Sequence, residues 1–206
     1  MIDGCSGGAR AAPEDQEWKA AASAAMDRYA SGDDAAFVEL YDRLEPRLSA
    51  FLFRRTRCPA RTEDLVQQTF LQMHCARRHF VSGAAVMPWA FAIARRLLID
   101  GLRKGSREEL DEGNGDDRES HAPGARPDDA AIRRRLARRL DEELARVSDL
   151  DRAAFELVRY DGLSMAEAAE VLGTTANAVK LRAHRASEAL RASLGDEVRE
   201  ELGWLT

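Results

Sequence analysis

A cluster of polar and cationic residues between positions 177 and 185 is the part of this chain best suited to bind another molecule. On a helix, one side of this stretch carries hydrogen-bond donors around a single aliphatic residue. The members of that side are Asn177, Lys180, Leu181, His184 and Arg185, with Arg182 on its flank. Lysine and arginine bind DNA phosphates, and mixed polar and apolar groups meet base edges in the major groove. The spacing favours a DNA-reading helix; the alternative is an amphipathic helix whose basic residues only face solvent.

The residues around this face predict a helix-turn-helix. Ser164 and Glu167 have the S-x-x-E spacing of a capping box, which begins a first helix. Gly173 stands where that helix must end in a left-handed residue, and Thr174 or Thr175 then caps a second helix. The second helix has an apolar stripe that must pack inward, and it consists of Val179, Ala183, Ala186 and Leu190.

A helix with two different sides is also predicted after the cap Thr62-Glu63-Asp64. Its apolar side consists of Val66, Thr69, Phe70 and Met73. Its other side is rich in amides around a central leucine and consists of Asp64, Gln67, Gln68, Leu71 and Gln72. This surface is either a solvated helix face or a polar contact with another protein.

A basic helix is predicted from Pro88, at its first position, to Lys104. One side stacks the apolar residues Phe91, Ala94, Leu98 and Leu102. The remaining surface is charged and contains Arg95, Arg96, Asp100, Arg103 and Lys104. We expect Trp89, at the helix start, to lie in the core rather than to stack on a base.

Helical patterns continue over the rest of the chain, and no run alternates as a strand would. Aromatic residues make up 6% of the sequence while alanine, leucine, arginine and glutamate are plentiful, so helices are favoured. We expect helices over about 17–30, after Ser31-Gly32-Asp33, and from Pro46, which marks a new start. The core is expected to contain Phe37, Val38, Leu40, Tyr41 and Leu44.

A stretch dominated by Gly, Ser, Asp, Glu and Pro divides the chain into two parts. It cannot offset its ordering entropy by burial, so it is predicted to be a flexible acidic linker. The fold class is therefore all-α, with two small helical domains, the second containing the helix-turn-helix. The predicted boundaries are a disordered tail over 1–15, a first domain over 16–104, the linker over 105–130, a second domain over 131–194 and a short C-terminal tail over 195–206. Within the second domain, Leu140 and Leu144 continue a four-residue repeat, and Ser148 or Asp149 caps the next helix.

Charge, cysteine spacing and hydropathy exclude several classes of protein. The formal net charge is -5, but acids concentrate between Glu108 and Asp129, and the remainder is slightly basic. The 3 cysteines are widely spaced without a C-x-x-C pair, which fits a reducing cytoplasm better than a disulfide framework or a zinc site. His74, Cys75 and His79 fall on different helix faces and are expected to be structural or exposed. No signal peptide or membrane-length apolar run is recognisable, and no nucleophile-base pair, phosphate loop or metal-ligand cluster indicates an enzyme or a cofactor.

Three separated blocks, in this order, resemble an extracytoplasmic-function (ECF) sigma factor of bacterial RNA polymerase. They run from Thr62 to Leu71, from Pro88 to Asp100 and from Gly162 to Arg185. The resemblance implies polymerase-clamp docking by Asp64, Gln67, Gln68 and Leu71. It implies capture of flipped minus-ten bases by the loop from Phe80 to Met87 and the helix with Arg95, Arg96, Asp100, Arg103 and Lys104. It implies recognition of the minus-thirty-five element by the helix with Asn177, Lys180, Leu181, Arg182, His184 and Arg185.

The resulting hypothesis is a cytoplasmic alternative sigma factor that binds core RNA polymerase and promoter DNA and directs DNA melting and transcription initiation. The two sigma-like parts have no third compact domain between them. The resemblance therefore implies control from outside by an anti-sigma factor. Two alternatives stay open: a sigma mimic that occupies an anti-sigma factor without touching DNA, and a stand-alone helix-turn-helix regulator.

Overall fold

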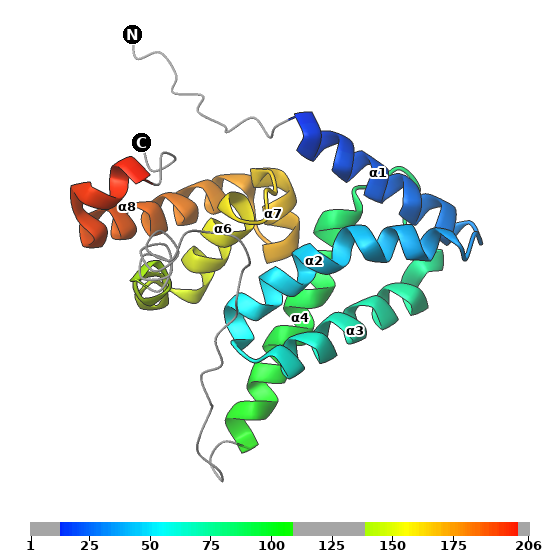
Figure 1. The fold of residues 1–206 in the computed structure, drawn as a ribbon, viewed down its shortest axis with the longest axis horizontal. Helices are drawn as coiled ribbons and strands as arrows, with labels where there is room; N and C mark the ends of the chain where they lie inside the picture. The colour runs from blue at the N-terminus through cyan, green and yellow to red at the C-terminus, as the bar shows by residue number, and fades with distance from the viewer. Residues whose placement is uncertain (1–12, 109–138, 202–206) are drawn as a thin grey trace, which may run out of the picture.

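The computed structural model describes residues 13–108 and 139–201, and every regular element in these ranges is a helix (Figure 1). Side chains are described for residues 16–102 and 139–193. The first helical group comprises α1 (Pro13–Ala30), α2 (Ala36–Thr56), α3 (Pro59–Ala76), the short 3-10 helix η1 (Arg77–His79) and α4 (Val86–Glu108). The second helical group comprises a helical segment at 139–146, α6 (Asp149–Arg159), α7 (Met165–Leu172) and α8 (Ala176–Glu201). The predicted all-α class is confirmed for these ranges, and no helix within them is both long and apolar enough to cross a membrane.

The buried stripe of α2 explains why one predicted helix boundary is wrong. Pro46 was expected to begin a helix, but it lies inside α2. A proline removes only its own N–H bond to the carbonyl four residues earlier, and here its side chain is exposed, where water can reach that carbonyl. On the opposite side, Leu44 and Leu48 are fully buried and continue the apolar stripe past the proline. Packing therefore holds the helix together across Pro46.

The start of α3 also differs from the prediction. The helix begins at Pro59, which occupies its first turn, rather than after a cap at Thr62. Thr62 is buried, and its hydroxyl lies 2.9 Å from the Cys58 carbonyl oxygen and 2.7 Å from Thr56 Oγ1. Thr62, in the first turns of α3, thus stabilises the turn between α2 and α3 through these hydrogen bonds.

Several apolar residues lie farther out than expected. Val38 is 62% exposed and Tyr41 is 38% exposed, because the buried stripe of α2 follows Leu40 and Leu44 instead. On α4, Leu102 is also exposed, although Phe91, Ala94 and Leu98 of the same predicted stripe are buried.

Three helices extend past the predicted domain limits. α4 starts two residues before Pro88 and continues to Glu108, so residues 105–108 of the predicted linker are helical. α8 continues to Glu201, into the residues predicted to be a tail. α1 starts at Pro13, so residues 13–15 of the tail predicted over 1–15 are helical as well. The remaining residues of the predicted tails and linker, 1–12, 109–130 and 202–206, lie outside the described residues.

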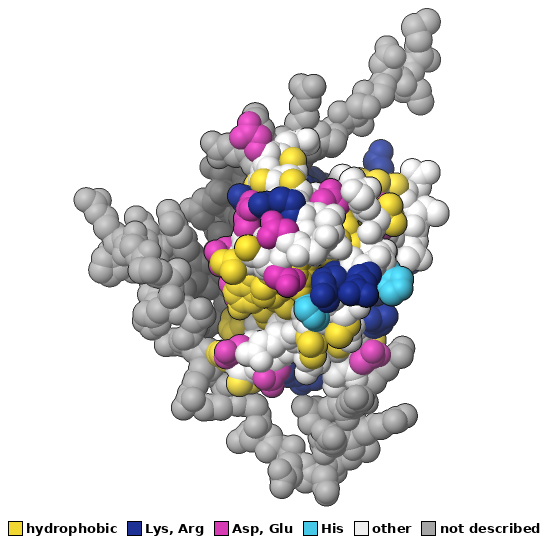
Figure 2. All heavy atoms as spheres, turned by 90° about the vertical axis from the view of Figure 1, so that its right-hand side faces the viewer, with side chains coloured by type: hydrophobic (Ala, Val, Ile, Leu, Met, Phe, Trp, Pro, Cys, Tyr) yellow, Lys and Arg dark blue, Asp and Glu magenta, His cyan; other side chains and the backbone are white. Residues whose placement is uncertain are grey.

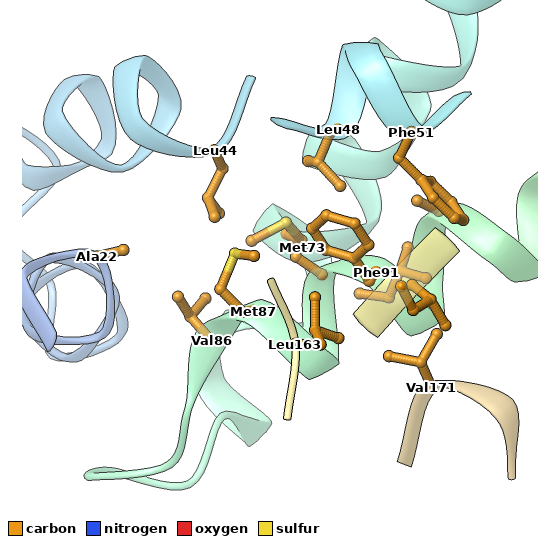
Figure 3. Close-up of a cluster of buried hydrophobic side chains, with 14 of the residues drawn as sticks. Ala22, Leu44, Leu48, Phe51, Met73, Val86, Met87, Phe91, Leu163 and Val171 are labelled. Carbon is orange, nitrogen blue, oxygen red and sulfur yellow. The ribbon is translucent and has the colours of Figure 1, made fainter. Parts of the chain in front are cut away.

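One hydrophobic core runs through both helical groups. Figure 3 shows Met73, Met87 and Phe91 of the first group meeting Leu163 and Val171 of the second. The first group surrounds this core with α1–α4, and α7 packs against α4 from the other side. A smaller cluster lies within the second group and consists of Leu140, Leu144, Phe155, Ala186 and Leu190. The shared core fixes where the surface of each helix points.

Candidate nucleic-acid interface

The turn between α7 and α8 is held by the caps that the sequence predicted. Glu167 N–H donates to Ser164 Oγ at 3.2 Å, and Ser164 N–H donates to Glu167 Oε2 at 2.6 Å, which completes the capping box. Gly173 ends α7 with φ +62°, a left-handed conformation that glycine adopts without strain. Thr175 rather than Thr174 caps α8, because its Oγ1 accepts from the Ala178 N–H at 3.2 Å. The helix-turn-helix is confirmed.

The two sides of α8 are separated as predicted. The buried side consists of Val179, Ala183, Ala186 and Leu190. The exposed side consists of Asn177, Lys180, Leu181, His184 and Arg185, while Arg182 lies half-buried on the flank. Leu181, at the centre of this polar side, is 50% exposed. A helix of about 10–12 Å diameter fits a major groove about 12 Å wide, so this side can meet base edges while its cations meet phosphates.

The charged surface of α4 is less accessible than that of α8. Arg96 and Asp100 are exposed, and Arg96 donates to Gln72 Oε1 of α3 at 2.6 Å. Arg95 is half-buried, and its burial, together with the nearby charge of Arg55, lowers the pKa of its guanidinium. The helix also carries Arg103 and Lys104, which lie beyond the residues whose side chains are described.

The start of α4 is anchored in the core. Trp89 is partly buried against the core, as predicted, with its ring centroid 5.2 Å from that of Phe80. Pro88 and Met87 are buried beside it. The loop before α4 therefore contacts the core through Phe80, which packs against Trp89.

The amide-rich side of α3 is exposed, as the helical spacing predicted. Asp64, Gln67, Gln68 and Leu71 are all exposed, with Leu71 62% exposed. The opposite side of the helix is buried as predicted and consists of Val66, Thr69, Phe70 and Met73.

A hollow of about 540 Å³ beside Leu71 is a feature that the sequence did not indicate. It is lined by side chains of α1, α2 and α3, including Tyr29, Phe37, Tyr41 and Phe70. Tyr41 lies 4.6 Å from Phe70 between ring centroids. Figure 2 looks onto this end of the molecule and shows apolar side chains flanked by cationic and histidine side chains. The i, i+4 spacing of Phe37 and Tyr41 was visible in the sequence, but it indicated burial rather than an open surface.

The histidine-cysteine region of α3 has structural contacts. His74 Nδ1 shares a hydrogen bond with the hydroxyl of Tyr29, and Arg77 hydrogen-bonds to the other ring nitrogen. Cys75 and His79 are exposed. Over the described residues, no group of three or more His, Cys, Asp or Glu side chains is placed to hold a metal ion.

Comparison with known proteins gives matches over both helical groups. The family model for sigma-70 region 2 matches residues 40–108, and the model for sigma-70 region 4 matches residues 137–190. The RNA polymerase sigma factor CarQ of Myxococcus xanthus is 33% identical over 171 residues, covering 83% of this chain and 96% of CarQ. The ECF RNA polymerase sigma factor SigF of Caulobacter vibrioides is 36% identical over 169 residues, covering 81% of this chain and 90% of SigF.

A solved structure is similar over both groups as well. It is the sigma factor RpoE of Bartonella quintana, in complex with the anti-sigma factor NepR. Its TM-score is 0.62 at 25% identity, and the match covers 77% of this chain and 96% of that chain. The chain therefore belongs to the ECF group of the sigma-70 family, whose members are transcription initiation factors rather than catalytic enzymes.

Proposed function

We propose that this sigma factor docks on core RNA polymerase through α3 and reads two promoter elements, the minus-ten element with α4 and the minus-thirty-five element with α8. One observation carries this assignment. On α3 and α8 the proposed surface is the exposed side of a helix whose opposite side is buried in the core, and on α4 Arg96 and Asp100 are exposed opposite a buried side, so each helix is held in place. Rigid elements hold a binding surface more precisely than loops do.

On α8, the chemistry of each side chain decides whether we assign it to phosphates or to base edges. Lys180 and Arg185 supply charge for phosphates, and Arg182 on the flank extends that charge along the groove. Asn177, Leu181 and His184 supply an amide, an aliphatic group and an imidazole for base edges. We assign this role to the proposed second domain, 131–194.

For α4, we propose a contact with single-stranded DNA. Melting needs a surface that holds unpaired bases better than the duplex does, and a basic channel supplies part of that affinity. We assign this role to Arg95, Arg96, Asp100, Arg103 and Lys104, within a proposed first domain over 16–104 that the linker over 105–130 joins to the second.

On α3, the amide-rich surface suits a polar protein contact with one apolar anchor. Leu71 is the exposed anchor, with Asp64, Gln67 and Gln68 around it. The hollow next to Leu71 adds Tyr41 to this surface, and exposed aromatic groups are enriched at protein interfaces.

An anti-sigma factor is the proposed regulator. The similar sigma factor RpoE of Bartonella quintana was solved in complex with its anti-sigma factor NepR. We infer that this chain is likewise held by a partner of that class, and that it acts in the cytoplasm, where bacterial polymerase transcribes.

Run-off transcription with purified bacterial core polymerase tests the proposal, on templates whose start sites are mapped after induced expression of the chain. The wild type should give promoter-dependent product. Leu71→Asp should reduce both core binding and product at least tenfold, because it places a charge at the centre of the docking surface. Val38→Asp is the matched control, since Val38 is equally exposed at 62% but lies on α2, outside the proposed surface.

The other outcomes identify the alternatives. A wild-type chain that binds no core polymerase but still binds duplex DNA would be a stand-alone regulator. A wild-type chain that binds an anti-sigma factor but binds neither DNA nor core polymerase would be a sigma mimic.

A further inference from the structure

The loop before α4, residues 80–85, is held in place by a helix that lies far from it in the sequence. The backbone N–H of Gly83 donates to both carboxylate oxygens of Asp27 on α1, at 3.1 and 3.2 Å. The backbone N–H of Val86, at the start of α4, donates to Ser23 Oγ at 3.2 Å. Ser23 and Asp27 have the i, i+4 spacing that puts two residues on one side of a helix. One side of α1 therefore supplies both acceptors.

The Ser23 hydroxyl takes the place of a local helix cap. The first N–H groups of a helix have no partner within the helix, and a Ser, Thr, Asp or Asn just before the helix commonly accepts from one of them. Here Ala84 and Ala85 precede α4, and neither has a polar side chain. Val86 is fully buried, where an unpaired N–H would be costly. Ser23 thus supplies, from another helix, the acceptor that the local sequence lacks.

The two acceptors are themselves held in place. The Ser23 hydroxyl donates to the Lys19 carbonyl oxygen at 3.0 Å, which leaves its oxygen free to accept from α4. Met26, next to Asp27, is fully buried, and so is Ala22, next to Ser23. α1 packs against α4, and Figure 3 shows Ala22 pointing toward the start of that helix. The core therefore fixes where α1 presents its carboxylate and its hydroxyl.

A tight turn within the loop directs one N–H toward α1. The Ala84 N–H donates to the Val81 carbonyl oxygen at 3.0 Å, and Gly83, the third residue of the turn, has φ +79°. A left-handed third residue favours glycine. A Cβ at Gly83 would meet no atom within 4 Å, so backbone conformation rather than space selects the glycine there. Asp27 then holds this turn against α1.

The tip of the turn presents groups that suit an unpaired base. Val81 is 72% exposed, and Ser82 is exposed beside it. Arg78, on η1 just before the loop, is exposed as well. An apolar group can pack against the face of an extruded base, a hydroxyl can hydrogen-bond to its edge, and a cation can meet a phosphate. Such groups select one base over another only if the loop keeps them in one arrangement.

We propose that Asp27 and Ser23 are positioning residues for base selection, which hold the loop before α4 in the conformation that captures a flipped base of the minus-ten element. This inference rests on the proposed minus-ten role of α4 and extends that role to the loop. Neither residue needs to touch DNA. A loop that already has its binding conformation loses less conformational entropy when the base enters. The family model for region 2 matches residues 40–108, so these two residues belong to a helix outside that match.

Promoter melting by core polymerase with the full chain tests the proposal. The templates are a mapped promoter and a series in which each non-template base of its minus-ten element is changed in turn. Asp27→Ala should reduce melting of the mapped promoter by about tenfold, the scale of one hydrogen bond to a charged acceptor. It should also reduce the preference between bases at the captured position to within about twofold. A merely structural defect would lower melting of all templates by one factor and leave the base preference unchanged.

Three further variants sharpen this test. Asp27→Asn keeps a side-chain carbonyl that can accept from the Gly83 N–H, so it should restore most of the base preference. Ser23→Ala should act in the same direction as Asp27→Ala with a smaller effect, because its hydroxyl is uncharged. Glu17→Ala is the matched control, since Glu17 is an exposed carboxylate of the same helix, and it should behave as the wild type. If both Asp27 variants bound promoter DNA more tightly than the wild type, Asp27 would act by repelling phosphates, and the proposal would be overturned.

Amide hydrogen exchange of the free chain, followed by NMR, measures the positioning without DNA. The Gly83 amide should exchange about tenfold faster in Asp27→Ala than in the wild type, while amides in the middle of α2 keep their rates. Equal exchange at Gly83 in both chains, or an unchanged base preference in Asp27→Ala, overturns the inference. A wild-type chain that melts no promoter would overturn the proposed function, whereas the exchange rates would still show whether Asp27 holds the loop.

Discussion

The two helices proposed to read the promoter, α4 and α8, both carry cations but differ in what surrounds them. On α8, Lys180, His184 and Arg185 are exposed, and their side chains make no hydrogen bond or ion pair with the described part of the chain. On α4, Arg96 is bound to Gln72 and Arg95 is half-buried near Arg55. Arg55 in turn pairs with acids of the second helical group.

Under the proposed function, this difference predicts that the two surfaces bind DNA at different stages. The cations of α8 can meet phosphates without breaking an internal contact. On α4, Arg96 must leave its amide partner, and Arg95 is already partly desolvated beside another cation. We expect duplex DNA to bind first on α8, and α4 to be used once polymerase and DNA have rearranged its surroundings.

The largest effect is expected from the buried sides of these helices. Phe91 of α4 is fully buried in the core that both groups share, and Leu190 of α8 is fully buried in the cluster confined to the second group. Phe91→Ala should lower the free energy of unfolding by about 3–5 kcal/mol, because a cavity remains where the ring was. Chemical denaturation followed by circular dichroism should show one destabilised transition for Phe91→Ala, whereas Leu190→Ala should act mainly on the second group. A loss below about 1 kcal/mol for Phe91→Ala would contradict the shared core.

A change in pH should act on the contact between the two helical groups, through Asp161. Burial raises the pKa of Asp161 to about 6, against the opposing effect of Arg54; Glu156 raises it further and Arg47 lowers it. A carboxyl group whose pKa is raised binds its proton more tightly in the packed structure, where Asp161 is buried, than in a state that exposes it to water. The packed structure therefore gains stability as pH falls through about 6, and the gain is complete below about 4. For a shift of about two units the gain is at most about 3 kcal/mol.

The measurement is the radius of gyration at pH 7.5 and pH 5.5. The wild type should be at least as compact at the lower pH, and Asp161→Asn, which keeps the shape but cannot titrate, should respond less. A larger radius of gyration of the wild type at pH 5.5 than at pH 7.5 would contradict this prediction. The affinity of α8 for a minus-thirty-five duplex should have the same pH dependence in the wild type and in Asp161→Asn. This result would show that the titration of Asp161 does not affect the α8 surface.

Removal of cations should distinguish α8 from α4 directly. Lys180→Ala/Arg185→Ala should weaken binding of the free chain to duplex DNA and reduce the salt dependence, with the slope of log K against log salt falling by about 2. Arg96→Ala should leave that binding almost unchanged and act on promoter melting in the polymerase complex. Fluorescence anisotropy at several salt concentrations measures the first effect, and permanganate reactivity of melted thymines measures the second. Equal losses of duplex binding in both variants would remove the distinction between the helices.

The smallest effect is expected at the turn that positions α8. Ser164→Ala removes one half of the capping box and should cost about 1 kcal/mol of stability. Thermal unfolding measures it, and Ser193→Ala is a control, because Ser193 is an exposed serine in the interior of α8 rather than at a cap. If the two serine variants are equally stable, the capping box does not hold the turn.

Local features were predictable in the second helical group to within one residue. Ser164 and Gly173 act as predicted, Ser148 is one of the two residues expected to cap α6, and the two sides of α8 follow from helical spacing. Each of these features depends on residues within about one or two helical turns. The same reasoning separated the exposed and buried sides of α3.

Predictions failed where long-range packing outweighed local preference. Pro46 lies within α2 because the buried leucines on either side of it hold the helix in place. Tyr41 is exposed beside Phe70, a residue that lies far from it in the sequence. An apolar residue type favours burial, but the neighbours that the fold brings to it decide whether its side chain is buried.

The sequence by itself determined the all-α class, the capping box and C-cap of α7, the amide-rich side of α3, the two sides of α8 and the family resemblance. The tertiary structure decided how the two groups meet, including the pairing of Arg54 with Asp161, which are 107 residues apart. The physical reason is the range of the interactions. Helical periodicity and capping act between residues a few positions apart, whereas a buried ion pair forms only after the whole chain has brought its partners together and removed their water.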